Sequence, residues 1–273
     1  MEAFWTYPFM QRALIAAILV SVVCSCLGVF VVLRKLTFLS DAVAHATFTG
    51  IALGLLIKAD PLLTGMLFSV LGAISLIYLM EKTDLSLDTL IGVYFSAAVA
   101  LGIVLLRFSP HYQSEVLERL FGSILGISWW DLAIHAALTV VVLATLFYHL
   151  KTFLKMAFHR DLAASEGINV RAYDYLFMML LALTITISIE MIGVLLVSAL
   201  VIIPAASSRL LFRSFGGVMA GAMAISLTST LAGLLASFYV RIPDGPSLPS
   251  GPAIVLCTLV FFAASAVVHR KHR

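Results

Sequence analysis

The stretch DYLFMMLLALTITISIEMIGVLLVSALVIIPAASSRLLF, residues 174–212, is apolar over nearly all of its length. As one helix it would be about 58 Å long, at about 1.5 Å per residue, whereas the hydrocarbon core of a bilayer is about 30 Å thick. A helix of that length exceeds a single crossing. The sequence therefore predicts two membrane spans that turn near Glu190 to Gly193.

The whole chain has the composition of a polytopic membrane protein, with 62% hydrophobic residues, 11% charged residues and a mean hydropathy of +1.10. Its apolar runs fall at about 10–33, 41–57, 61–80, 89–106, 130–149, 174–191, 193–212, 216–239 and 251–268. We expect an all-α bundle of eight or nine transmembrane helices, surrounded by membrane lipid. Because spans and short connections occupy residues 1–273, we expect one membrane domain without a separate soluble domain.

Basic residues are distributed unevenly over the connections between these runs. If the amino terminus lies outside, the inner side holds twelve of them: Arg34, Lys35, Lys82, Lys151, Lys155, Arg160, Arg171, Arg209, Arg213, Arg270, Lys271 and Arg273. The outer side holds five: Arg12, Lys58, Arg107, Arg119 and Arg241. This asymmetry predicts that the 150–173 loop and the carboxyl terminus are cytoplasmic. It also explains the net charge of +3 without a nucleic acid partner.

Asp41 and His45 stand four residues apart near the start of an apolar run, in the stretch SDAVAHA at residues 40–46. On a helix this spacing puts both side chains on one face, where a carboxylate oxygen and an imidazole nitrogen can bind one cation. Inside a membrane the pair indicates metal passage. The alternative is structural, with the aspartate as a helix cap and the histidine bonded to a backbone carbonyl. The spacing alone leaves both open.

Glu190 is the other carboxylate that lies within an apolar run or at its turn. Because intramembrane carboxylates are costly and tend to face a cavity or a partner, Glu190 is a candidate pathway residue. The alternative is a solvated carboxylate at the outer turn between two spans. The outer segment 107–129 is long enough to dip back into the membrane.

Motifs for enzymatic chemistry are missing from the sequence. It has no His-Glu-x-x-His, no Gly-x-Ser-x-Gly in a span and no Walker motif. The chain is therefore expected to be non-catalytic, without a permanently bound cofactor. If ATP drives transport, the ATPase is a separate subunit.

The connection after residue 158 contains a short, partly polar helix. Asp161 is a start signal and Gly167 is a stop signal, and they enclose the sequence LAASE. The helix lies in the longest connection predicted to be cytoplasmic. It is either a docking element or an ordinary interfacial loop helix.

Five stretches, taken in order, resemble the membrane permease subunits of zinc, manganese and iron ABC importers. They are residues 40–46 with Gly50, 120–125, the positions Asp161, Ala164 and Gly167, residues 193–206, and residues 249–251. The resemblance covers nearly the whole chain. It implies a helical bundle similar to the vitamin B12 and siderophore importer permeases, located in a prokaryotic inner membrane.

The resemblance also implies partners and roles. The permease would work with a second copy or a homologue, two cytoplasmic ATPase subunits and an extracytoplasmic metal-binding protein. Asp41 and His45 would line the path and hold the transported manganese, zinc or iron ion. The helix carrying Asp161, Ala164, Glu166 and Gly167 would dock into the ATPase.

Two positions depart from the family pattern. Thr49 stands before Gly50 where members often carry proline, which brings a helix break there into question, and Pro252 replaces a usual small residue. A different class of function also stays open at this point. In a proton-coupled secondary transporter, Asp41 and His45 would relay protons instead of binding metal. An intramembrane enzyme has the least support.

Overall fold

The computed structural model describes residues 8–108, 127–240 and 248–271. Within these ranges nine helices are long and apolar enough to cross a membrane. They are α2 (Pro8–Leu33), α3 (Thr37–Ile57), α4 (Pro61–Lys82), α5 (Leu87–Arg107), α7 (Trp129–Tyr148), α10 (Val170–Ile192), α11 (Val194–Leu211), α12 (Phe215–Tyr239) and α13 (Ser250–Lys271). Two short helices, α8 (Leu150–Phe158) and α9 (Arg160–Ser165), connect α7 to α10.

The predicted all-α bundle is therefore confirmed, with nine candidate spans in the described part of the chain. Residues 109–126, which include most of the outer segment expected to dip into the membrane, lie outside the described residues. The same holds for residues 241–247 in the second outer connection.

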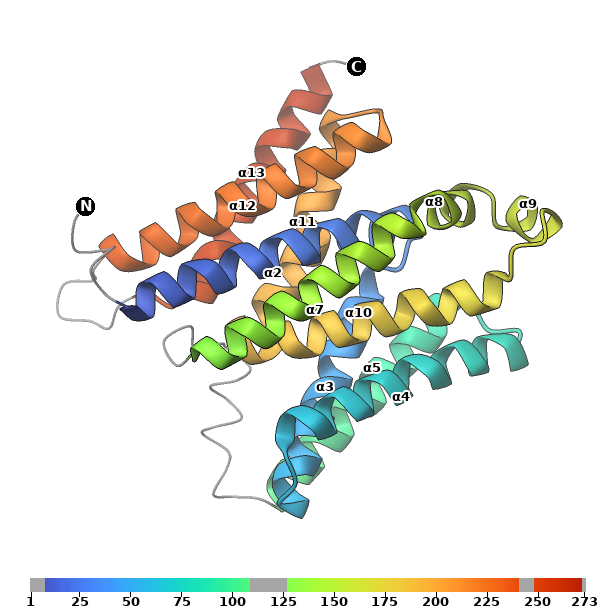
Figure 1. The fold of residues 1–273 in the computed structure, drawn as a ribbon, viewed down its shortest axis with the longest axis horizontal. Coiled ribbons are helices and arrows are strands. Elements are labelled where there is room, and N and C mark those ends of the chain that lie inside the picture. Colours follow the sequence, from blue (N-terminus) through green and yellow to red (C-terminus); the bar gives the residue numbers. More distant parts are fainter. Residues whose placement is uncertain (1–7, 109–126, 241–247, 272–273) are drawn as a thin grey trace.

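The helices form rows that other helices cross at steep angles. In Figure 1, α12, α2, α7, α10 and α4 run in broadly similar directions, while α3, α11 and α13 run across them. α3 packs on both α4 and α5, α10 packs on α4, and α11 packs on α2 and α13. The crossing helices thus join the rows into one bundle.

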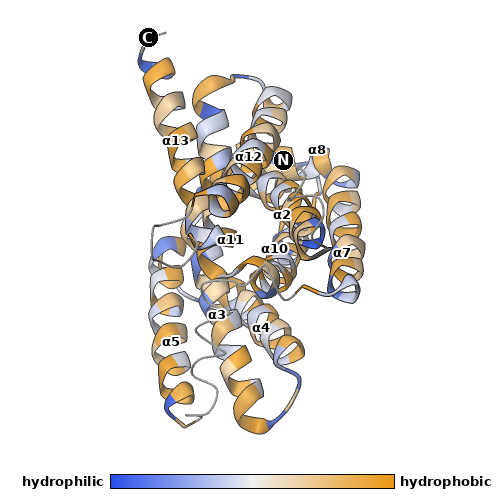
Figure 2. Cartoon of the chain, turned by 90° about the vertical axis from the view of Figure 1, so that its left-hand side faces the viewer, coloured by the Kyte–Doolittle hydropathy of each residue, from blue (hydrophilic) through white to orange (hydrophobic). Residues whose placement is uncertain are grey.

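Burial separates central helices from peripheral ones. The most apolar windows of α2, α3 and α10 are 72% buried, whereas those of α5 and α13 are 22% buried. Figure 2 shows that the peripheral helices carry many hydrophobic residues, with hydrophilic ones mainly at helix ends and connections. Lipid or another protein must cover such surfaces, because exposing them to water would be unfavourable.

The long apolar run turns where its length predicts. α10 ends at Ile192, Gly193 adopts φ 84° and ψ 161°, and α11 begins at Val194. The left-handed φ of Gly193 is readily available only to glycine. α11 does not return alongside α10 but crosses it, as Figure 1 shows, so the turn places the two spans in different layers.

α3 lies very close to its neighbours. A Cβ atom built on Gly50 would lie 2.6 Å from Cβ of Phe68 and 2.7 Å from the carbonyl oxygen of Thr64, both in α4. Small residues permit this kind of close helix approach in membranes. The absence of a side chain at Gly50 therefore allows α3 to pack tightly on α4.

No helix break occurs at Thr49, since α3 is continuous from Thr37 to Ile57. The hydroxyl of Thr49 lies 3.0 Å from the carbonyl oxygen of His45 and 2.6 Å from that of Ala98 in α5. A proline at this position would have neither this hydroxyl nor a backbone N–H. In this chain the residue that departs from the family pattern joins α3 to α5.

Candidate metal pathway

Asp41 is the fifth residue of α3 and does not cap the helix. α3 begins at Thr37, and its N-cap residue, Leu36, makes no side-chain capping bond. The cap interpretation of Asp41 is therefore wrong, because the helix starts one turn earlier than the apolar run does. The half-buried Asp41 carboxylate has a different environment.

His45 is also half-buried and packs edge-on against Phe95 of α5, with ring centroids 4.8 Å apart and planes at 87°. This edge-to-face contact is a favoured aromatic geometry and holds the imidazole in place. Among the described residues, neither Asp41 nor His45 has a side-chain hydrogen bond or ion pair. The bond from His45 to a backbone carbonyl, which the structural alternative requires, is thus not observed. Both side chains keep free lone pairs for a cation.

A cavity of about 470 Å³ adjoins Asp41. Its described wall consists of Phe38, Asp41, Asp88, Ile91, Gly92 and Phe95. Asp41 belongs to the early part of α3 and Asp88 to the first turn of α5, so the cavity lies where these two helices begin. Phe95 is shared, because it lines the cavity and contacts His45.

Asp88 is the wall residue that sequence reasoning missed. An acidic residue in the first turn of a helix is common, because it interacts favourably with the helix dipole. Nothing local distinguishes Asp88 from such a residue. What distinguishes Asp88 is that it lies at the same end of the bundle as Asp41. This position becomes visible only from the packing of α5 on α3.

The pair Asp41 and His45 is not completed into a larger ligand set. In the part of the chain that the structure describes, no group of three or more His, Cys, Asp or Glu side chains is placed to hold a metal ion. Glu190 is half-buried in the last turn of α10 and does not join the pair in such a group. Two ligands suit transient contact better than permanent binding, since structural metal sites use more ligands.

The predicted connector helix is present as α9, with small shifts at its ends. It starts at Arg160 after His159, which makes no side-chain cap, so the expectation that Asp161 begins the helix is wrong by one residue. Asp161 lies in the first turn, where its charge still favours the helix dipole. Ala164 lies in the helix and Glu166 is its C-cap residue.

Gly167 ends α9 as expected, with φ 81°. Its N–H donates to the Ala164 carbonyl at 3.0 Å, and the N–H of Ile168 donates to the Ala163 carbonyl at 3.2 Å. These two bonds form a Schellman motif, in which glycine takes the left-handed position. α9 is consequently a short helix with a well-defined end, and only Ala163 among its residues is buried.

Nine candidate spans in the described ranges, and a cavity that combines carboxylates with an apolar wall, are typical of a membrane transport protein. The sequence matches the ABC 3 transport family over residues 6–269, and the chain belongs to that family. This match confirms the resemblance predicted from the motifs.

Several relatives with described roles are similar over nearly the full chain. The high-affinity zinc uptake system membrane protein ZnuB of Haemophilus influenzae is 32% identical, with 95% of this chain and 97% of that protein covered. The manganese transport system membrane protein MntC of Listeria monocytogenes is 30% identical, with 97% and 92% covered. The chelated iron transport system membrane protein YfeD of Yersinia pestis is 33% identical, with 96% and 86% covered.

Solved structures agree with the fold. PsaBC from Streptococcus pneumoniae, solved in complex with Fab, is similar with a TM-score of 0.84 at 30% identity, covering 97% of this chain and 93% of that one. An ABC transporter in an inward-facing conformation has a TM-score of 0.73 at 14% identity, covering 94% and 85%. The second likeness concerns the fold alone.

The cavity wall provides a direct test of water access. No heavy atom lies within 4 Å of a Cβ built on Gly92, so a Gly92→Cys side chain fits without displacing a neighbour. Because thiols react as thiolates, which need water, we expect a polar thiol reagent to label this cysteine in membranes. Labelling is measured by mass spectrometry of the intact protein.

Val93→Cys is the matched control, since Val93 is the next residue of α5 and is exposed but does not line the cavity. We expect little labelling at position 93, with the unmodified chain giving the background from Cys24, Cys26 and Cys257. Equal labelling at positions 92 and 93 would contradict a hydrated cavity beside Asp41.

Proposed function

We propose that this chain is the permease subunit of an ATP-driven importer of divalent transition-metal ions. The observation that carries the proposal is the Asp41 carboxylate on a cavity wall, one helical turn from His45, in a member of the ABC 3 transport family. The relatives named for zinc, manganese and chelated iron transport support this cargo class. Carboxylate oxygen and imidazole nitrogen suit manganese, zinc and ferrous iron alike.

In this proposal the metal ion is the cargo, and Asp41 and His45 bind it in transit. The negative charge of Asp41 lowers the cost of bringing a cation into the membrane, and the imidazole replaces part of its hydration. Asp88, on the same cavity wall, attracts the ion from Asp41 toward the start of α5. Glu190 stays a proposed pathway residue on the outer side, at the end of α10.

ATP hydrolysis takes place on other subunits, because this chain has no Walker motif. We infer two cytoplasmic ATPase subunits, a second permease copy or homologue and an extracytoplasmic metal-binding protein. α9 is the proposed ATPase-docking element, with Asp161, Ala164, Glu166 and Gly167 forming or ending it. The alternative of a proton-coupled transporter is not favoured, because the chain belongs to an ABC transport family.

The proposed orientation in the inner membrane follows from charge. If the nine spans alternate across the membrane, twelve basic residues fall on the side of α9 and the carboxyl terminus, against five on the other side. This distribution favours a cytoplasmic location for both. The start of α3 and the cavity then face the cytoplasmic half of the membrane.

Loss of either ligand should stop transport. For Asp41→Ala and His45→Ala we expect metal uptake to fall by about tenfold or more. Replacing a residue that only hydrogen-bonds to a metal ligand already lowers metal affinity or activity by about tenfold. Association with the ATPase should persist, since both residues belong to α3 and not to the proposed docking helix α9. Uptake of radioactive manganese or zinc into cells measures the effect.

Asp84→Ala provides the matched control, since Asp84 is an exposed carboxylate in the connection between α4 and α5. It should transport normally. Normal uptake by both Asp41→Ala and His45→Ala would remove these residues from the pathway.

Disrupting the α9 helix should uncouple ATP hydrolysis from metal uptake. A proline at Ala164 costs a helix interior about 3 kcal/mol, which is too much for a helix of six residues. We expect Ala164→Pro to lose ATPase binding or to hydrolyse ATP without uptake, and charge reversal at Glu166 to weaken the same contact. Metal binding at Asp41 and His45 should survive. Full transport by Ala164→Pro with the ATPase bound would locate the docking surface elsewhere.

Single cysteines test the orientation. Ser165 at the end of α9 and Ala59 between α3 and α4 are both exposed, and they lie on opposite sides in the proposed topology. An impermeant thiol reagent added to intact cells should label Ala59→Cys, and should label Ser165→Cys only after the membrane is opened. Labelling of Ser165→Cys from outside would reverse the topology.

A further inference from the structure

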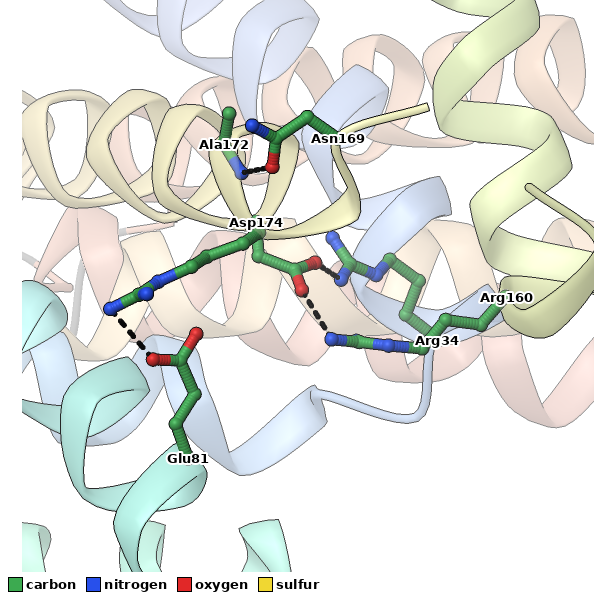
Figure 3. A network of polar contacts seen from close by, with 7 residues as sticks. Arg34, Glu81, Arg160, Asn169, Ala172 and Asp174 are labelled. Carbon is green, nitrogen blue, oxygen red and sulfur yellow. Dashed lines mark hydrogen bonds and ion pairs between the residues drawn. The ribbon is translucent and has the colours of Figure 1, made fainter. Parts of the chain in front are cut away.

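Asp174 is a buried carboxylate near the start of α10, only 2% exposed. A buried charge is unfavourable by several kcal/mol unless it is paired, so a carboxylate is retained at such a position only with suitable partners. Figure 3 shows that arginines from two different parts of the chain approach this one carboxylate. The proposed roles of Asp41, His45 and α9 do not by themselves require a buried carboxylate between two arginines.

The two carboxylate oxygens of Asp174 have separate partners. Oδ1 pairs with Nη2 of Arg34, whose side chain is 10% exposed. Oδ2 lies 2.7 Å from Nη2 of Arg160, whose side chain is 49% exposed. The Arg34 guanidinium also lies 5.0 Å from the ring centre of Phe177, a cation–π distance. Asp174 therefore takes part in two ion pairs: a buried one with Arg34, called here the buried arm, and a half-exposed one with Arg160, called the surface arm.

The buried arm leads to the metal ligands. Arg34 lies in the short connection between α2 and α3, where Lys35 adopts a left-handed φ of 57°. The N–H of Arg34 donates to Phe30 at 2.9 Å, and the N–H of Leu36 donates to Val31 at 2.8 Å. Because this connection is short and hydrogen-bonded, its backbone has little conformational freedom. A displacement of Arg34 is therefore passed to the start of α3, where Asp41 lies one turn further on.

The surface arm leads to the proposed ATPase-docking helix. Arg160 is the first residue of α9. The preceding helix, α8, is held by Phe153, whose ring packs on Phe30 at 6.0 Å and on Phe177 at 5.9 Å between centroids. Among the described residues α9 has no aromatic contact of this kind; its one buried residue is the small Ala163, and its C-cap residue Glu166 pairs with Lys155 of α8 instead of a span. Among the described ion pairs, Arg160–Asp174 is the one that joins α9 to a membrane span.

We propose that Asp174 is a positioning residue that transmits movement of α9 to the metal-binding part of α3. A push on α9 acts on Asp174 through Arg160, and Asp174 acts on the α2–α3 connection through Arg34. The inference rests on the proposed docking role of α9. It adds a specific mechanical route, through one buried carboxylate, from the docking surface to Asp41.

A second ion pair in the same region supplies a matched control. Arg171, in the first turn of α10, lies 2.8 Å from Glu81 of α4, with side chains 60% and 28% exposed. Exposed ion pairs of this kind contribute about 0–1 kcal/mol to stability. Among the described residues no ion pair joins Arg171 or Glu81 to α9 or to the α2–α3 connection, so loss of this pair should not affect coupling.

The test uses the complete transporter in lipid vesicles, with its ATPase and metal-loaded binding protein, and measures ATP hydrolysis and Mn²⁺ uptake separately. Arg160→Gln removes the half-exposed arm and leaves Asp174 paired with Arg34, so the protein should fold. We expect uptake per ATP hydrolysed to fall by about 2- to 30-fold. ATP hydrolysis and equilibrium binding of Mn²⁺ should stay near wild type. Arg160→Lys, which keeps the charge, should restore part of the coupling.

Asp174→Asn, which removes the charge at constant size, should give the same loss, and Arg171→Gln should give none. Wild-type uptake per ATP in Arg160→Gln overturns the inference, whether or not Asp174→Asn folds. An equal loss in Arg171→Gln overturns it as well, because the effect would then be general to charges near α10. If Ala164→Pro uncouples while Arg160→Gln does not, only the route through Asp174 is wrong. If Ala164→Pro transports normally, the docking role of α9 fails and the inference fails with it.

Discussion

The hydroxyl of Thr186 in α10 holds α3, the helix that carries Asp41 and His45, in place. It lies 2.9 Å from the hydroxyl of Thr47 in α3 and 2.8 Å from that of Ser69 in α4, and all three side chains are fully buried. In a bilayer a buried hydroxyl finds no water, so these groups satisfy one another and fix three helices in register. α3 is thereby packed on α4 and α10, while Asp41 faces the cavity beside α5.

The positions of the spans could be predicted because the physical constraint is local. An apolar run of known length must match the bilayer thickness, and a run twice as long must turn, as the chain does at Gly193. The shared helix face of Asp41 and His45 also follows from their spacing. Helix ends were less predictable, as α3 and α9 show, because a helix can begin before its apolar run or without a side-chain cap.

Contacts between distant elements had no local signal. Asp88 joins the cavity because α5 packs on α3, and hydropathy does not specify which helices are neighbours. Asp174 looks like an ordinary carboxylate at the end of a span. Its pairing with Arg34 spans 140 residues of sequence and depends on the packing of α10 beside α2. Tertiary packing thus converts an unremarkable acidic residue into a buried junction between two arginines.

The open space beside Gly92 has a consequence for how this protein can diverge. A Cβ atom added at this position has no heavy atom within 4 Å, so a substitution such as Gly92→Ala can narrow the cavity without moving a helix. A substitution at Asp41 instead removes the carboxylate that we propose binds the transported cation. Descendants of this chain can therefore change the size of the cavity while they inherit an unchanged pair of Asp41 and His45.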